Sequence, residues 1–163
     1  MNTSEGEGYP RVRVAVQEDV AELTKLINAA FVVERPFLEG ERIDERGTRE
    51  FFQKGKFLVL EDSFGMHGCV YCELRGDRGY LGLLAVYPAR QGTGSGRELM
   101  AAAEEYFRSA GCVVVDLRII SQRTPLPALY RHLGYVETGT AAFAASLPIK
   151  APGHYILMSK QLI

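Results

Sequence analysis

Residues 79–100 read Gly79-Tyr80-Leu81-Gly82-Leu83-Leu84-Ala85-Val86-Tyr87-Pro88-Ala89-Arg90-Gln91-Gly92-Thr93-Gly94-Ser95-Gly96-Arg97-Glu98-Leu99-Met100, and the rest of the chain is arranged around them. An apolar strand leads into a glycine-rich loop, and the loop opens a helix. Because Gly92, Gly94 and Gly96 carry no side chains, the backbone N–H groups there stay uncovered. The first N–H groups of a helix lack intrahelical partners and lie at the positive end of its dipole. The segment therefore predicts a site for a phosphate or pyrophosphate, flanked by Arg90 and Arg97.

The spacing of these glycines shows which phosphate-binding motifs the segment can and cannot be. A Walker loop requires a lysine after its last glycine, and a dinucleotide fingerprint requires Gly-x-Gly-x-x-Gly, whose last glycine is replaced here by Arg97. The segment instead reads Gln91-x-x-Gly94-x-Gly96 and follows the corner Val86-Tyr87-Pro88. The plainer alternative is a glycine-rich turn that only caps a helix.

Length and composition describe an ordinary globular chain. With 163 residues, 47% hydrophobic and 24% charged, the sequence predicts one domain with a proper core. A net charge of −1 gives no electrostatic reason to expect a nucleic-acid or membrane partner. No apolar run approaches the ~20 residues of a membrane span, and no signal peptide opens the chain, so we expect a cytoplasmic protein.

The three cysteines do not form a recognisable metal or disulfide pattern. Cys69 and Cys72 match C-x-x-C, but they lie in a strand-like run, where residues three apart point to opposite faces. No second pair of ligands completes a zinc site. We therefore expect Cys69, Cys72 and Cys112 to be buried free thiols, and no metal site.

Hydrophobic periodicity and turn residues predict an α/β chain. After a disordered tail at residues 1–10, the expected strands are 11–16, 56–61, 67–74, 79–87, 112–120, 135–138 and 154–160, and the expected helices are 17–31, 44–52, 95–110 and 124–133. A strand, a helix of about 15 residues and a strand make strands 79–87 and 112–120 parallel. Residues 32–43 show no period, so they either line a pocket or form a solvated loop.

The order and the motifs together resemble the GNAT acetyltransferase superfamily over residues 11–163. Three blocks carry this resemblance: the opening strand and helix at 11–31, the loop segment 84–100, and Ala128-Leu129-Tyr130-Arg131-His132-Leu133-Gly134-Tyr135. The resemblance implies a single α/β (α+β) domain with a mixed, mostly antiparallel sheet that is splayed at a central parallel strand pair and flanked by helices.

The same resemblance implies acetyl-CoA as co-substrate. Carried over, Leu84, Ala85 and Val86 meet the pantetheine arm, and Gln91, Gly92, Thr93, Gly94, Ser95, Gly96 and Arg97 cradle the pyrophosphate. Arg90 or Arg97 meets the nucleotide phosphate. The family's frequent asparagine after the fifth strand is absent, because Ser121-Gln122-Arg123 stand there.

Catalytic roles follow from the resemblance only in part. Tyr130 matches the tyrosine that protonates the leaving thiolate, although its spacing also suits a packing residue. Many relatives place a glutamate about eleven residues before the loop glutamine, where this chain has Tyr80. The base therefore stays open: Glu73 acts directly or through a water, and Asp116, His154 and Tyr80 are further candidates. Asp116 alternatively pairs with Arg118 on the same strand.

The resulting hypothesis is an N-acetyltransferase that moves an acetyl group to a primary amine of a small molecule or peptide by direct attack on the thioester. The substrate is expected near Phe31, Glu34 and Tyr71, where acidic residues favour a cationic amine. A homodimer is one expected assembly. Alternatives are a catalytically silent acyl-CoA-binding sensor or interaction module, and a nucleotide-phosphate binder such as a kinase.

Overall fold

The computed structural model describes residues 10–162. Its elements are β1 (Arg11–Val14), η1 (Gln17–Asp19), α1 (Val20–Ala30), η2 (Phe31–Glu34), α2 (Glu45–Lys54), β2 (Lys56–Asp62), β3 (Gly65–Arg75), β4 (Arg78–Val86), η3 (Pro88–Arg90), α3 (Ser95–Ser109), β5 (Val114–Ile120), α4 (Leu126–His132), β6 (Val136–Ala142) and β7 (His154–Gln161), where η marks a 3-10 turn. The predicted order of strands and helices is confirmed. Of the tail expected at residues 1–10, only Pro10 lies within the described residues.

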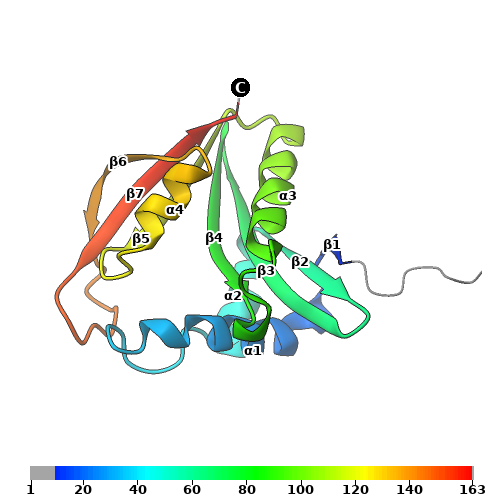
Figure 1. Ribbon diagram of the computed structural model, residues 1–163, viewed down its shortest axis with the longest axis horizontal. Coiled ribbons are helices and arrows are strands. Elements are labelled where there is room, and N and C mark those ends of the chain that lie inside the picture. Colours follow the sequence, from blue (N-terminus) through cyan, green and yellow to red (C-terminus); the bar gives the residue numbers. More distant parts are fainter. Residues whose placement is uncertain (1–9, 163) are drawn as a thin grey trace, which may run out of the picture.

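The seven strands form one mixed sheet in the order β1-β2-β3-β4-β5-β7-β6 (Figure 1). All neighbouring strands are antiparallel except β4 and β5, which are parallel and joined through α3. A parallel pair requires such a crossover, and the helix of the crossover covers one face of the sheet. The predicted mixed sheet with one central parallel pair is confirmed.

The parallel pair separates soon after it forms. Backbone pairing between β4 and β5 runs only from Arg78↔Val114 to Tyr80↔Asp116, and β4 then continues to Val86 without a partner on that side within the described residues. In Figure 1 the two strands meet near the C-terminal end of the chain and diverge toward α1. The predicted splay of the sheet is therefore present.

An irregularity in β4 lies at the start of the gap. The register between β3 and β4 shifts between Cys69 and Tyr71, opposite Leu83. Leu83 has φ of 48°, the one positive φ at a non-glycine residue in the described part of the chain. A leucine in this conformation is strained, and such strain persists only where the surroundings impose it. The bulge turns β4 away from β5.

Two hydrophobic clusters cover the two faces of the sheet. On one face α3 buries Leu99, Ala103 and Phe107 at helical spacing against β2–β5, and α4 adds Tyr130. On the other face α1 buries Leu23, Leu26 and Ile27 against β2–β4. Side chains alternate along each strand, so consecutive residues of β4 and β5 face different helices.

The cysteines divide between these clusters as their spacing predicts. Cys69 packs with α1 and Cys72 packs with α3, and all three cysteines are free and buried. Within residues 10–162 no helix is long and apolar enough to cross a membrane.

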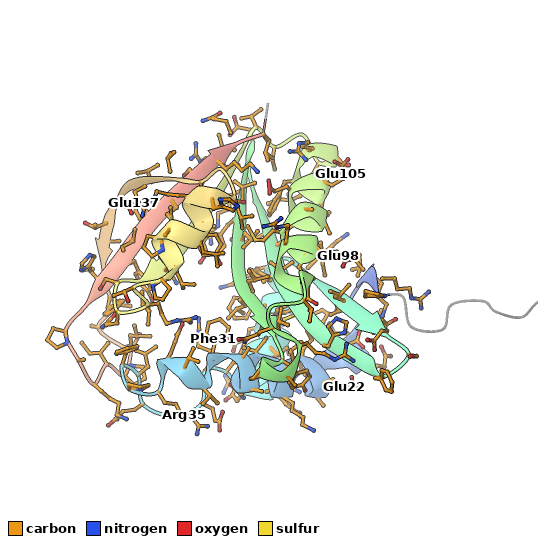
Figure 2. The ribbon with its side chains drawn as sticks, in the orientation of Figure 1. Glu22, Phe31, Arg35, Glu98, Glu105 and Glu137 are labelled. Atoms are coloured by element: carbon orange, nitrogen blue, oxygen red, sulfur yellow. The ribbon has the colours of Figure 1, made fainter. Side chains whose placement is uncertain are left out.

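The segment after α1 is more ordered than a solvated loop. It begins with η2 and is joined to the connection between β6 and β7, and we call residues 35–42 with 147–150 the strap. The joints are the hydrogen bonds from Glu39 N to Pro148 O (2.9 Å) and from Lys150 N to Phe37 O (2.7 Å), and the antiparallel bridge Leu38↔Ile149. Figure 2 shows Phe31 on the sheet side of this segment and Arg35 pointing away.

Candidate active site

A cleft of about 930 Å³ occupies the gap between β4 and β5. Its lining comes from both faces of the sheet. The loop half lies on the side of α3 and α4 and includes Leu84, Val86, Gln91, Gly92, Gly96 and Tyr130. The charged half lies on the side of α1 and α2 and includes Phe31, Glu34, Tyr71, Glu73, Asp116 and Arg118.

The backbone of the loop half is arranged to bind an anion. Gly92 and Gly94 have φ of 80° and 87°, a region that favours glycine, and Gly94 is the N-cap of α3. In the described part of the chain, the N–H groups from Gly92 to Arg97 have no hydrogen-bond acceptor. Successive free N–H groups at a helix N-terminus form a concave anion site.

The side chains of the loop hold its shape. Gln91 Nε2 donates to Val86 O (3.1 Å), so this side chain ties the loop to the end of β4. Thr93 Oγ1 donates to Arg90 O (2.6 Å) and lies 3.0 Å from Ser95 Oγ. The residues predicted to surround the pyrophosphate therefore lie around one turn, and the Gln91 side chain stabilises that turn through its bond to Val86 O.

The two arginines beside the loop have different surroundings. Arg90 Nη1 lies 2.8 Å from Asp62 Oδ2, and this bond lowers the pKa of the aspartate. Arg97 is exposed and has no ion pair with another described residue. Of the two, Arg97 is the one whose charge is free for a phosphate.

The three residues predicted to meet pantetheine lie on two faces of the sheet, because side chains alternate along β4. Leu84 and Val86 line the cleft on the α3 side. Ala85 is buried in the cluster under α1, so only its backbone can reach the gap. Beyond Tyr80, the edge of β4 that faces β5 has no strand partner, which leaves backbone N–H and C=O groups for a bound molecule.

Tyr130 lies on α4 and lines the gap between β4 and β5. Its side chain is buried, packs edge-on against Tyr135 at 5.9 Å, and lines the cleft. Burial raises the pKa of Tyr130 to about 12, against a smaller opposing effect of Arg123. The phenol therefore stays protonated at neutral pH and can donate a hydrogen bond or a proton.

Glu73 is held by two donors in the charged half. The Tyr71 hydroxyl donates to Glu73 Oε1 (2.6 Å), and Arg75 Nε donates to Oε2. Burial acts to raise the pKa of Glu73, but the bonds from Tyr71 and Arg75 outweigh it and lower the pKa. Glu73 is ionised at neutral pH, and it is a weaker base than an unperturbed glutamate.

Asp116 is paired with a partner that the sequence did not indicate. The guanidinium of Arg78 binds both carboxylate oxygens at 2.7 Å, and Ser159 Oγ donates to Oδ1 (2.5 Å). The bond from Arg78 is the first cause of the lowered pKa of Asp116. The alternative pairing with Arg118 is wrong, because Arg118 instead stacks on Tyr155 at 4.2 Å. Strand pairing brought Arg78 beside Asp116, and spacing along one strand cannot show this.

Glu34 connects the segment after α1 with the end of β5. Arg123 Nη1 lies 3.0 Å from Glu34 Oε2, and both side chains are largely buried. Burial raises the pKa of Glu34, and the charges of Arg123 and Arg42 oppose this. Arg42 lies over the Phe31 ring at 5.5 Å. Of residues 32–43, Glu34 and Arg42 line the cleft, as the pocket alternative predicts, whereas most of the others are exposed.

The remaining base candidates differ in position. Tyr80 lines the cleft between Glu73 on β3 and Asp116 on β5, and Arg75 stacks on its ring at 4.0 Å. His154 is exposed at the start of β7 and does not line the cleft. Of the described residues, no group of three His, Cys, Asp or Glu is placed to hold a metal ion.

Sequence reasoning missed three features of the site: the bulge at Leu83, the strap, and the arginines of the charged half. Alternating apolar residues hid the bulge, because nothing in the pattern marks Leu83. The arginines were visible individually, but they come from separate elements. Only the folded sheet brings them to one face.

Comparison with known sequences identifies a family. A sequence model described as "Acetyltransferase (GNAT) family" matches residues 20–135. A mycothiol acetyltransferase of Rhodococcus erythropolis (strain PR4 / NBRC 100887) is 31% identical over 129 residues, which is 72% of this chain and 43% of that protein. One of Clavibacter sepedonicus is 29% identical over 94 residues, or 57% of this chain and 31% of that protein. The chain thus spans less than half the length of these relatives.

Solved structures share the fold. The ribosomal-protein-S18-alanine N-acetyltransferase from Escherichia coli has a TM-score of 0.76 at 16% identity, with 94% of each chain covered. Ard1 from Thermoplasma volcanium has a TM-score of 0.78 at 14% identity, covering 94% of this chain and 98% of its own. The yncA structure from Salmonella typhimurium, which contains acetyl-CoA, has a TM-score of 0.73 at 21% identity, with 94% of each chain covered.

Proposed function

The chain belongs to the GNAT acetyltransferase family, and from this premise we propose that it transfers an acetyl group from acetyl-CoA to a primary amine by direct attack on the thioester. The family match over residues 20–135 supports an acyltransferase, and a family structure that contains acetyl-CoA supports this donor. The identity of the acceptor and the roles of individual residues are our proposal. The observation that carries it is the cleft between β4 and β5, with an anion site in its loop half and ionised side chains in its charged half.

In this proposal the loop half binds the donor. The free N–H groups from Gly92 to Arg97 bind the pyrophosphate at the N-terminus of α3, and Arg97 adds its charge to a nucleotide phosphate. The pantetheine arm lies along the unpaired edge of β4 near Leu84 and Val86. The thioester then reaches the bulge at Leu83, opposite the charged half.

The attack creates charges that the site has to accommodate. An alkylamine with a pKa of about 10.4 is mostly protonated, and at pH 7 its neutral form costs roughly 4.6 kcal/mol. The neutral nitrogen attacks the thioester carbon, and the carbonyl oxygen becomes an oxyanion. Backbone N–H groups of β4 beside Leu83 supply hydrogen bonds to that oxygen, in a fixed position that costs no reorganisation.

Collapse of the tetrahedral intermediate breaks the bond between carbon and sulfur. The thiolate leaves, and Tyr130 donates to it as general acid. The nitrogen loses two protons in total, one before attack and one after, while the thiolate takes up one, so each turnover releases one proton. The raised pKa of Tyr130 suits a group that has to arrive protonated at every turnover.

We assign removal of the amine proton to Glu73 acting through a water. Glu73 lies in the charged half, its side chain is 15% exposed, and each of its oxygens keeps a lone pair beside the bonds from Tyr71 and Arg75. Its lowered pKa makes it a transient carrier that passes the proton on to solvent. Tyr80, between Glu73 and Asp116, can complete a water chain.

The test is acetyl transfer from acetyl-CoA to a panel of amines, followed by thiol release and by mass spectrometry of the product. The panel includes amino acids, polyamines, a peptide N-terminus and the amine precursor of mycothiol, because two partial relatives bear the name mycothiol acetyltransferase. We expect one amine class to be acetylated far faster than the thioester is hydrolysed. Thioester hydrolysis alone, across the panel, would contradict the proposal.

A second candidate is an acyl-CoA-binding module without catalysis. It is favoured by one observation: Glu34, Glu73 and Asp116 are all ion-paired with arginines, so no carboxylate of the charged half is a free base. Calorimetry separates the two candidates, because the module binds acetyl-CoA and turns over no amine. Binding of ATP without binding of acetyl-CoA would favour the nucleotide-phosphate alternative.

A homodimer and one catalytic unit over residues 11–163 are also part of the proposal. β6 is an edge strand with exposed residues such as Val136. An exposed edge is a surface through which a second copy can pair. Sedimentation velocity across a concentration series tests the dimer, and monomers at every concentration would exclude it.

A further inference from the structure

The charged half of the cleft carries an excess of positive charge. Six cationic side chains and three carboxylates line it, which leaves a formal excess of three positive charges: Arg42, Lys54, Arg75, Arg78, Arg118 and Arg123 against Glu34, Glu73 and Asp116. Each carboxylate is already bound by one of the arginines. The expectation that acidic residues favour a cationic amine therefore does not follow from this arrangement.

Arg118 is the cation that is best placed for a ligand. Val115, Leu117 and Ile119 of β5 pack on the α3 side, so Arg118 points to the opposite face. If the register of Tyr80↔Asp116 continued, Arg118 would lie opposite Gly82, next to the bulge at Leu83. The side chain thus lies at the level where the proposed thioester meets the acceptor.

The guanidinium of Arg118 is positioned but not neutralised. It stacks on the Tyr155 ring at 4.2 Å, and among the described residues it has no carboxylate partner. Stacking on a ring occupies the face of the guanidinium and leaves the N–H groups along its edge. Such a planar fork matches the two oxygens of a carboxylate. The donor does not need this charge, because its anion site lies on the other face of the sheet.

The strap borders the charged half. Phe31, Glu34 and Arg42 line both the main cleft and a small cavity of about 50 Å³ under the strap, which Leu147 and Pro148 close from the other side. The backbone hydrogen bonds of the strap close this edge of the charged half, and a closed edge favours a small acceptor over an extended peptide.

On the basis of the proposed acetyl transfer, we propose that the acceptor is a small amine that carries a carboxylate, and that Arg118 binds this carboxylate. Arg42 and Lys54, which likewise have no ion pair among the described residues, add to the positive potential that attracts such a substrate. The carboxylate fixes the molecule so that its amine faces the thioester, close to Glu73.

The experiment compares amines that differ only in a carboxylate, such as L-glutamate with L-glutamine and L-phenylalanine with L-phenylalaninamide, at equal concentrations of neutral amine. In at least one pair, we expect the amine with the additional carboxylate to have a kcat/KM about 10-fold or more above that of its amide analogue. Arg118→Gln is expected to remove this preference, mainly through KM, and to leave the KM for acetyl-CoA unchanged. Arg118→Glu is expected to shift the preference to a polyamine.

The control variant is Arg46→Gln, since Arg46 lies exposed on α2 in a surface ion pair with Glu50. It is expected to behave as the wild type. Equal rates for amines with and without a carboxylate would overturn the inference, and so would preferred acetylation of a peptide or an equal effect of Arg118→Gln on all acceptors.

A binding measurement tests the role of Arg118 even if no amine is acetylated. L-Glutamate and the other carboxylate-bearing amines are titrated onto the complex with CoA by NMR, in the wild type and in Arg118→Gln. Binding that disappears in the variant supports the inference even where no amine is acetylated, in which case only the proposed activity fails. No binding of any carboxylate-bearing amine to the wild type would overturn it.

Discussion

The two halves of the cleft are built by different means. Apart from Tyr130 on α4, the loop half is formed by one continuous segment, Leu84 to Arg97, and the groups available for binding are mostly backbone N–H groups at the start of α3. The charged half consists of side chains from η2, α2, β3, β4, β5 and β7, and its ion pairs join residues as far apart as Glu34 and Arg123. A site made of backbone depends on local conformation, whereas a site made of side chains depends on which elements become neighbours.

This difference suggests a division of labour. A backbone cradle suits a group that is the same in every turnover, which in the proposed function is the pyrophosphate of the donor. Charged side chains can be exchanged without changing the fold, because most of those in the charged half lie at the surface of the cleft. We therefore expect substitutions in the loop half to affect donor binding, and substitutions in the charged half to affect the acceptor or the proton transfer.

The largest effect is expected at Tyr130, where the two halves meet. Tyr130→Phe removes the proton donor and is expected to lower kcat by about 100-fold, with little change in the KM for acetyl-CoA. Steady-state kinetics with the best amine measures this. The matched control is Tyr135→Phe, because the Tyr135 hydroxyl is also buried and has no hydrogen-bond partner among the described residues. Similar losses in both variants, or a kcat of Tyr130→Phe within twofold of the wild type, would argue for a packing role.

A smaller effect is expected for a side chain in the loop half. Gly94→Val places a branched residue at φ of 87° and covers the free N–H groups, so the affinity for acetyl-CoA is expected to fall about 30-fold. Calorimetry gives this number. Gly111→Val is the control, because Gly111 has φ of 89° just after the end of α3, and neither it nor its chain neighbours line the cleft. Both variants carry similar backbone strain, so we expect only Gly94→Val to bind acetyl-CoA more weakly than the wild type. Equal affinity would show that the loop does not hold the donor.

The charged half is tested by Glu73→Gln, for which we expect kcat/KM to fall about 10-fold. The bonds from Tyr71 and Arg75 lower the pKa of Glu73, so it is ionised throughout the neutral range. Deprotonation of the amine therefore sets the rise of the rate with pH. The pH profiles of two amines with different pKa should shift with the amine and should keep their position in the variant. A wild-type limb near pH 7 that disappears in Glu73→Gln would instead identify a glutamate with a raised pKa.

The smallest effect is expected at the exposed arginine of the loop half. Arg97→Gln is expected to weaken the binding of CoA about threefold at low salt, with the difference vanishing at high salt, because exposed charges are screened. CoA without its 3′-phosphate shows whether that phosphate is the contact. Arg90→Gln serves for comparison, since it breaks the ion pair with Asp62. A larger loss of affinity in Arg90→Gln would reverse the assignment.

The sequence was most informative where structure is local. The period of α3, the turn residues of the β2–β3–β4 meander and the crossover to β5 were all visible, because hydrophobic spacing and glycine positions record local conformation. Tyr130 was singled out by its match to a family motif on α4, and in the structure it lines the cleft. Phe31, Glu34 and Tyr71 were placed at the acceptor side, and all three do line the cleft.

Predictions that required knowledge of neighbours were less accurate. Spacing along one strand makes Arg118 the alternative partner of Asp116, but parallel pairing places Arg78 beside Asp116 and antiparallel pairing places Ser159 there. The segment 32–43 has no period, since its order comes from hydrogen bonds to residues 147–150. Neither contact leaves a signal in the spacing of residues along the chain.

The sequence alone determined the order of the elements, the parallel crossover and the glycine-rich start of α3 with its free N–H groups, because these features depend mainly on local spacing and on glycine. Tertiary structure decided the sign and the distribution of charge in the other half of the cleft. The sequence predicts acidic residues such as Glu34 and Glu73 on the acceptor side, but folding binds each carboxylate of the charged half to an arginine. Among the described residues, Arg118 has no carboxylate partner. Charges from distant elements act together only after the sheet has brought them within a few ångströms of one another.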